Sequence, residues 1–450
     1  MTDPHESTPL QILPSPVPKP PGAPEWQLAC VECGRMYAGL DVRYRCDCSG
    51  TLEVRHDLVR LWGKLRFSMF DARLASRVPA DRSGVWRFRE LILPLEEQHI
   101  VTRGEGNTTL YHIAEGNPLS RYAGVRELRF KHEGENPTGS FKDRGMTTGV
   151  SMAKRLGMTR VACASTGNTS ASMASYAAIA GMRAVVFIPE GNISFGKLSQ
   201  ALAYGARTVQ IRGDFDDAMR LVEEVSRREG IYLLNSLNPF RLEGQKAIAL
   251  ELLQDLDWQP PDWIVVPGGN LGNNSAIYKG VSELHCLGLL HHLPRLAVIQ
   301  AAGANPLYRA FSTGAERVEP IKNADTIATA IRIGNPVSAT KSMRAIKETR
   351  GVVEQVTDQE TMDAKAMIDA AGIGAEPASC VTVAGLRKLT AAGVIGPDEK
   401  IVCILTGHVL KDSDSTAKYH QGKLPGFTTA HANAPVVCDA GIDSVLRAIG

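Results

Sequence analysis

The chain alternates short, continuous apolar runs with longer segments in which apolar residues recur at helical spacing. Short apolar runs bounded by turn residues are typical of strands that are buried on both faces, and intervening helices indicate parallel sheets covered on both sides. We therefore expect an α/β fold with doubly wound parallel or mixed sheets. The expected strands are 161–164, 184–188, 208–211, 231–234, 264–266, 296–299 and 401–405.

The distribution of these runs predicts two sheet domains. The runs within residues 150–260 form one group, which we expect to be a small domain inserted into a larger one made of residues 58–149 and 261–430. Ligands of such sheets bind at the carboxyl ends of the strands, so we expect a site between the domains. The tail, residues 431–450, has little pattern apart from one short helix expected at 442–449.

Composition and charge exclude several function classes. A chain of 450 residues with 44% hydrophobic content can bury a large core. The 50 basic residues nearly balance the 48 acidic ones, which argues against a nucleic-acid partner. No apolar run approaches the roughly 20 residues that cross a bilayer, so we expect no membrane role.

The first residues, 1–25, are rich in proline. They have neither the apolar segment of a secretory signal nor the arginine-rich amphipathic pattern of a transit peptide. We expect an extended, disordered arm on a cytoplasmic protein.

Two cysteine pairs in residues 26–57 predict a small zinc-ribbon-like segment. Cys30 and Cys33 have Cys-x-x-Cys spacing, Cys46 and Cys48 have Cys-x-Cys spacing, and a glycine lies just beyond each pair. Four thiolates suit tetrahedral zinc, and so short a segment needs such a cross-link to fold. The second pair departs from the usual spacing, so a vestigial ribbon with free thiols is the alternative.

Lys142 is the first candidate for chemistry. It follows the turn sequence of residues 136–139 and precedes an apolar helical run that opens near Gly145, so rigid elements hold it on both sides. Burial disfavours the ammonium form, and a neutral amine is what forms a Schiff base with a carbonyl cofactor such as pyridoxal phosphate. On local pattern alone, an ordinary surface lysine fits as well. Three further motifs favour the Schiff-base lysine over the surface lysine.

The first of these motifs is the polar segment 164–172, which lies between an apolar strand and a helix rich in small residues. Hydroxyls, an amide side chain and the free amides of a helix N-terminus converge there, an arrangement that receives anionic groups without a cation. Its Asn168 could also hydrogen-bond a ring oxygen of a bound cofactor. Seen alone, the motif fits a routine helix cap equally well.

The second motif is a glycine-rich turn between the expected strand at 264–266 and a helix that contains Ala276. Glycines let the backbone approach a ligand closely, and consecutive amides at a helix start bind phosphate. The turn lacks the Gly-Lys-Ser/Thr end of a Walker loop and the glycine spacing of a dinucleotide fingerprint. The expected phosphate-binding residues are Gly268, Gly269, Asn270, Leu271, Gly272 and Asn273.

The third motif places Thr406 at the end of the expected strand 401–405. A neutral hydroxyl that faces a pyridine nitrogen leaves that nitrogen largely unprotonated and limits how far the ring withdraws electrons.

The order of four segments resembles that of the threonine synthases, pyridoxal phosphate enzymes of fold type II with the tryptophan-synthase-β fold. The segments are 140–145, 165–170, 268–273 and 405–408. The resemblance implies that Lys142 holds the cofactor, Asn168 contacts its phenolic oxygen, the glycine-rich turn binds its phosphate and Thr406 faces its ring nitrogen. It also implies a homodimer.

The segment 235–246 resembles the part of threonine synthases that grips the phosphate of O-phosphohomoserine. By this resemblance Asn235 and Arg241 bind the substrate phosphate, and an arginine fork suits a phosphate because it offers several directed donors. Lys197 resembles another ligand of that phosphate, and Ser165 and Thr169 would complete the substrate site.

The implied reaction converts O-phospho-L-homoserine and water to L-threonine and phosphate by γ-elimination and β-addition, with Lys142 as the mobile base. Three alternatives stay open. An enzyme of the cysteate synthase type would act on O-phosphoserine. A serine or threonine dehydratase shares the fold and the lysine but would not need Asn235 and Arg241. A catalytically silent homologue would bind ligands without chemistry.

Overall fold

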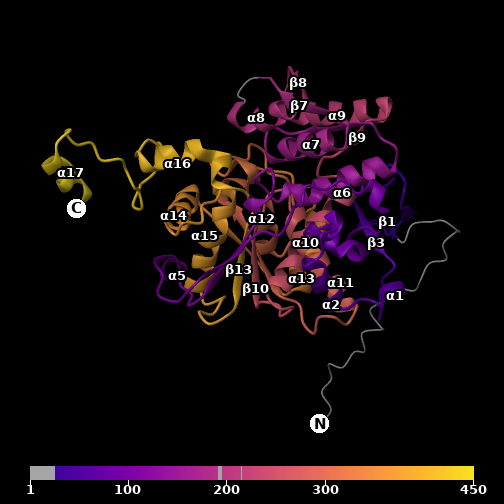
Figure 1. The fold of residues 1–450 in the computed structure, drawn as a ribbon, viewed down its shortest axis with the longest axis horizontal. Coiled ribbons are helices and arrows are strands. Elements are labelled where there is room, and N and C mark those ends of the chain that lie inside the picture. Colours follow the sequence, from indigo (N-terminus) through magenta and orange to yellow (C-terminus); the bar gives the residue numbers. More distant parts are fainter. Residues whose placement is uncertain (1–25, 191–194, 214) are drawn as a thin grey trace, which may run out of the picture.

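The computed structural model describes residues 26–190, 195–213 and 215–450, so the proline-rich arm lies outside the described residues. Strands form three sheets (Figure 1). The smallest is antiparallel, with β1 (Trp26–Cys30) between β2 (Met36–Ala38) and β3 (Leu52–His56). It is the ribbon-like segment expected at residues 26–57.

The largest sheet has six strands in the order β12-β11-β10-β13-β5-β4. All neighbours are parallel except the edge strand β4, which runs antiparallel to β5, so the sheet is mixed. The strands are β4 (Leu110–Ile113), β5 (Leu128–His132), β10 (Trp263–Pro267), β11 (Arg295–Ala301), β12 (Val352–Val356) and β13 (Ile401–Leu405).

A second, wholly parallel sheet has the order β8-β7-β6-β9 and lies at the top of Figure 1. Its strands are β6 (Arg160–Ala164), β7 (Arg183–Pro189), β8 (Arg207–Ile211) and β9 (Tyr232–Leu233). The expectation of an α/β fold with two doubly wound sheets is confirmed, and each of the seven expected runs is a strand. The domain boundaries stay a prediction.

Helices connect the strands and cover the sheets. They are α1 (Leu58–Leu61), α2 (Phe67–Leu74), α3 (Pro79–Arg82), α4 (Arg89–Ile92), α5 (Pro118–Ala123), α6 (Lys142–Arg155), α7 (Asn168–Ile179), α8 (Phe195–Ala203), α9 (Phe215–Glu229), α10 (Pro239–Asp255), α11 (Gly272–Cys286), α12 (Pro306–Thr313), α13 (Ala339–Glu348), α14 (Asp358–Ala370), α15 (Pro377–Ala391), α16 (Ser413–His420) and α17 (Ile442–Ile449). The last is the helix expected in the tail. None of the helices in the described ranges combines the length and the apolar character that crossing a membrane requires.

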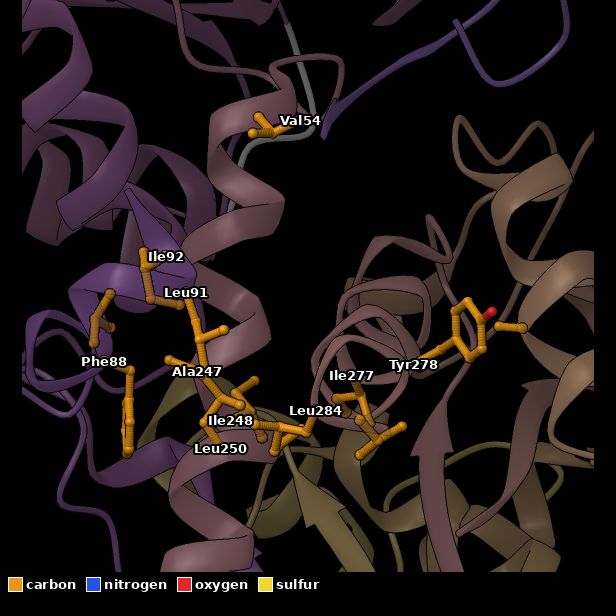
Figure 2. Close-up of a cluster of buried hydrophobic side chains, with 14 of the residues drawn as sticks. Val54, Phe88, Leu91, Ile92, Ala247, Ile248, Leu250, Ile277, Tyr278 and Leu284 are labelled. Carbon is orange, nitrogen blue, oxygen red and sulfur yellow. The ribbon is translucent and has the colours of Figure 1, made fainter. Parts of the chain in front are cut away.

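The helix α10 lies at the centre of the largest hydrophobic core and is buried from Pro239 to Gln254. Figure 2 shows Ile248 of α10 between Leu91 on one side and Leu284 of α11 on the other. A charged residue on a helix that is buried on all sides is costly unless a partner compensates it. On α10, Glu251 accepts hydrogen bonds from Arg144 of α6 at 2.7 and 3.2 Å, which fixes these two helices against each other.

Candidate active site

The residues singled out from the sequence lie where strands of both large sheets end. Strand β13 ends just before Thr406, β10 ends just before Gly268, and β6 ends just before Ser165. The Phe141 amide donates to the Thr406 carbonyl at 3.0 Å, so the start of α6 is attached to the end of β13. This attachment places Lys142, the first residue of α6, at the carboxyl edge of the six-stranded sheet.

Lys142 is partly buried, and its Nζ lies 4.3 Å from the centre of the Phe141 ring. The pKa of its amine is lowered to about 7, chiefly by burial and also by the nearby Arg241, while Glu376 opposes both effects. The next residue, Asp143, fixes the backbone by accepting hydrogen bonds from the Thr138 amide at 2.6 Å and from the Ser172 hydroxyl. The backbone that carries the amine is therefore fixed, and the amine is substantially neutral near pH 7.

Asn168 is the first residue of α7 and is joined to a carboxylate that the sequence analysis missed. Its Nδ2 donates to the two carboxylate oxygens of Glu376 at 3.3 and 3.2 Å. Glu376 lies just before α15, its amide donates to the Gly407 carbonyl at 3.0 Å, and a Cβ at Gly407 would lie 2.3 Å from its carboxyl group. The Pro377 that follows signals a helix start, but nothing local indicates where the carboxylate points.

Thr406 is buried and contacts a second residue that the sequence analysis missed. Its hydroxyl lies 3.0 Å from that of Ser379, whose Oγ also accepts the amides of Thr406 at 2.8 Å and Gly407 at 3.0 Å. Because these amides use both lone pairs of the Ser379 oxygen, its proton must go to Thr406. The hydroxyl proton of Thr406 is then available to an acceptor such as a pyridine nitrogen.

The glycine-rich turn fits a phosphate. Leu271 has a left-handed φ of 61° and α11 begins at the next residue, so free helix amides follow a sharp turn. Both polar atoms of the Asn273 side chain are buried, and neither has a hydrogen-bond partner in the described part of the chain. A Cβ at Gly269 would lie 3.1 Å from the Ile331 Cα, so glycine is what lets the turn pack this closely against Ile331.

Asn270 has a different surrounding from the rest of the turn. Its Nδ2 donates to the Ser236 hydroxyl at 2.7 Å, and its Oδ1 accepts the Val337 amide at 2.7 Å. The Asn270 side chain therefore connects the turn to the segment that begins at Asn235. Because its polar atoms are used in these contacts, only the backbone of Asn270 is available to a ligand.

Arg241 is a buried cation that forms no ion pair with a carboxylate of the described residues. It is only 1% exposed, one Nη donates to the Leu234 carbonyl at 3.0 Å, and its buried Nε has no partner among the described residues. Burial lowers the pKa of its guanidinium to about 10, and no carboxylate of the described residues contributes to this pKa. Such a group is costly unless an anion compensates it, so the site fits a phosphate or carboxylate ligand.

The other expected substrate residues have varied surroundings. Asn235 pairs with the backbone of Ala164, accepting its amide at 2.9 Å and donating to its carbonyl at 3.1 Å. Ser165 and Thr169 are half-buried in the loop and helix start that follow. Lys197 belongs to α8, but its side chain lies outside the described residues.

The chain is similar to several known proteins over most of its length. The family model of pyridoxal-phosphate dependent enzymes matches residues 101–407. The threonine synthase of Methanosarcina acetivorans is 47% identical over 426 residues, which cover 94% of this chain and 98% of the relative. The threonine synthase of Methanocaldococcus jannaschii is 47% identical over 390 residues, covering 86% and 94%.

Solved structures share the fold at low identity. The threonine synthase of Escherichia coli superposes with a TM-score of 0.66 at 19% identity and covers 94% of each chain. Maize serine racemase superposes with a TM-score of 0.57 at 20% identity, covering 70% of this chain and 94% of the racemase. Identities in this range establish the fold alone.

Proposed function

The chain belongs to the pyridoxal-phosphate-dependent enzymes and, among them, to the threonine synthase family, and on this premise we propose that it converts O-phospho-L-homoserine and water to L-threonine and phosphate. The observation that carries the choice of substrate is Arg241, a buried cation near Lys142 with no counter-ion among the described carboxylates. A phosphate monoester of an amino acid supplies both groups that this site lacks, an amine for the cofactor and an anion for the arginine.

Four parts of the site have surroundings that fit pyridoxal phosphate. Lys142 binds it through its neutral amine, the turn 268–273 binds its phosphate with helix amides and Asn273, and Thr406 donates to its ring nitrogen. Asn168 binds its phenolic oxygen. When bound, pyridoxal phosphate supplies an electron sink that acidifies the α- and β-hydrogens of an amino-acid substrate.

Lys142 is the base for the proton transfers. A base works best when its pKa is near the operating pH, and the pKa of this amine is lowered to about 7. The attachment of Phe141 to Thr406 and of Asp143 to Thr138 and Ser172 keeps the amine in place while it accepts and returns protons.

Arg241 binds the substrate phosphate and stabilises it as it leaves. Its charge is not neutralised by a described carboxylate, so the full attraction is available to a phosphate whose negative charge grows on departure. Asn235 fixes the β6 end through Ala164 and thereby positions Ser165 and Thr169 beside the substrate. An unphosphorylated substrate, as in a dehydratase, would leave Arg241 uncompensated.

The experiment is product analysis of the purified enzyme with O-phospho-L-homoserine, O-phospho-L-serine, L-serine and L-threonine in parallel. Equal amounts of threonine and phosphate from the first substrate alone support the proposal. Turnover of O-phospho-L-serine instead would move the activity to the cysteate synthase type, and keto acids from unphosphorylated amino acids would make the protein a dehydratase. Lys142→Ala should abolish turnover, whereas the exposed Lys154→Ala on the same helix should not.

A further inference from the structure

The four cysteines of the ribbon form one compact group, here called the cysteine cluster, made of Cys30, Cys33, Cys46 and Cys48. All four sulfurs lie within 4.8 Å of one another. Three of the sulfur pairs are 3.5 Å apart, too far for a disulfide bond, and all four residues are free thiols.

This geometry suits one tetrahedral metal ion. With metal–sulfur bonds of about 2.3 Å, tetrahedral ligands lie about 3.8 Å apart, close to the distances found here. The Cys33 amide donates to the Cys30 sulfur at 3.4 Å, which stabilises negative charge on that sulfur. The ribbon itself has only three short strands, so a cross-link at the cluster contributes directly to its folding.

We propose that the cysteine cluster holds one zinc ion and that the ribbon thus fixed positions the residues that bind the substrate phosphate. The first part rests on the cluster alone. The second part rests on the function proposed above, and it is carried by contacts between the ribbon and the segment that leads from β9 into α10.

The first contact is made by Tyr44, which lies between the two cysteine pairs, two residues before Cys46. Its hydroxyl accepts the Leu233 amide at 2.7 Å, and its ring meets the Tyr232 ring edge-on at 5.9 Å. The next residue, Leu234, is the one whose carbonyl accepts from Arg241. The cysteine cluster is thus connected through Tyr44 to the backbone that accepts a hydrogen bond from Arg241.

The second contact is made by His56 at the end of β3. Its Nε2 lies 2.7 Å from a carboxylate oxygen of Glu243, both side chains are buried, and Glu243 stands two residues after Arg241 on α10. A third contact joins the ribbon to α13, where Lys341 donates to the Leu52 carbonyl at 2.6 Å. The ribbon therefore contacts the chain before Arg241, at Leu233, and after it, at Glu243.

Metal analysis tests the first part on the full-length enzyme purified in the presence of a thiol reductant. We expect one zinc per chain, and loss of it in Cys33→Ser and Cys48→Ser, which change the two exposed members of the cluster. Cys438→Ser, an exposed cysteine far along the chain, should keep the metal. A metal-free protein whose cluster takes up neither Zn²⁺ nor Co²⁺ would overturn the assignment, as would a different metal in the cluster.

Tyr44→Phe tests the second part, because it removes the hydroxyl but none of the cysteines. We expect this variant to keep its zinc and its visible cofactor absorption, to bind inorganic phosphate about fivefold more weakly by calorimetry, and to show a raised KM with kcat little changed. Tyr111→Phe, which removes a hydroxyl that contacts Glu135 at the edge of β4, is the control. Unchanged phosphate affinity in Tyr44→Phe would refute the positioning role whatever the natural substrate is.

Discussion

The guanidinium of Arg241 lies near enough to the Lys142 amine to lower its pKa. Lys142 and Arg241 are therefore two basic side chains that repel each other in a partly buried site. The carboxylate of Glu376 raises the pKa of Lys142 but offsets only part of the lowering. On the proposed function, a phosphate bound at Arg241 would cancel the charge that acts on Lys142, and substrate binding would make the lysine a stronger base when it must remove a proton.

Replacing Arg241 should therefore have two effects. In Arg241→Leu the KM for O-phospho-L-homoserine should rise about 10- to 100-fold, because a charged hydrogen-bonding partner of the phosphate is lost. The pKa of Lys142 should also rise, since a neighbouring positive charge is removed. Steady-state kinetics at several pH values measure both, and Arg220→Leu, on the exposed face of α9, provides the control.

The pH dependence of cofactor binding should report the Lys142 amine directly. Only the neutral amine reacts with pyridoxal phosphate, and its pKa is lowered to about 7, so the rate at which the apoenzyme binds the cofactor should increase as pH rises through about 7 and then level off. Glu376 raises this pKa, so Glu376→Gln should shift the midpoint to lower pH, opposite to Arg241→Leu. Stopped-flow absorbance measures the midpoint of this pH dependence. The exposed Glu316→Gln should leave the midpoint unchanged. A midpoint near the ordinary pKa of lysine would show that the Lys142 pKa is not lowered.

Ser379→Ala should weaken cofactor binding without touching any residue expected to contact the substrate. The change leaves the amides of Thr406 and Gly407 without their acceptor and frees Thr406 to rotate. We expect about tenfold weaker cofactor affinity and a loss of about 1–3 kcal/mol in the free energy of unfolding. Equilibrium dialysis and urea denaturation measure the two quantities. Ser312→Ala, exposed at the end of α12, should change neither.

Glu251→Gln should destabilise the fold, because it leaves Arg144 and Lys131 with one buried carboxylate fewer. The expected loss is about 3–5 kcal/mol at neutral pH. In the native protein the pKa of Glu251 is held well below its ordinary value despite burial, chiefly by Arg144 and Lys131. Its stabilising effect is therefore present above the unfolded pKa of about 4.3 and is lost as pH falls below it. Urea denaturation should show a smaller acid-dependent loss in the variant than in the native protein; equal losses would exclude Glu251 as a source of acid sensitivity.

The sheet strands were predictable where their burial is continuous. The runs at β6, β7, β10, β11 and β13 are apolar throughout, and each is a strand. By contrast, β12 escaped prediction because Glu354 and Gln355 interrupt its apolar residues at a half-buried edge of the sheet. Local periodicity does not identify such a strand, since its structure depends on the neighbour with which it pairs.

Candidate site residues could be predicted where the local sequence itself indicates a ligand. The glycine-rich turn before α11 and the lysine at the start of α6 are of this kind. Glu376 was not predicted, because its role comes from a contact with Asn168 across 208 residues of sequence. Asn235 shows the converse. Its local pattern suggested a ligand, and the structure also gives it the task of holding the Ala164 backbone, while the ligand role stays a prediction.

Helix α10 has a consequence for protein engineering. Its first turn carries Arg241, and the rest of the same helix fills the centre of the core between α6 and α11. Core substitutions that are selected to raise the melting temperature would move α10 and Arg241 with it. Variants from such a library should therefore gain thermal stability and lose turnover. Stabilising substitutions are better sought on the outer helices, such as α9 and α14, whose movement does not carry Arg241 with it.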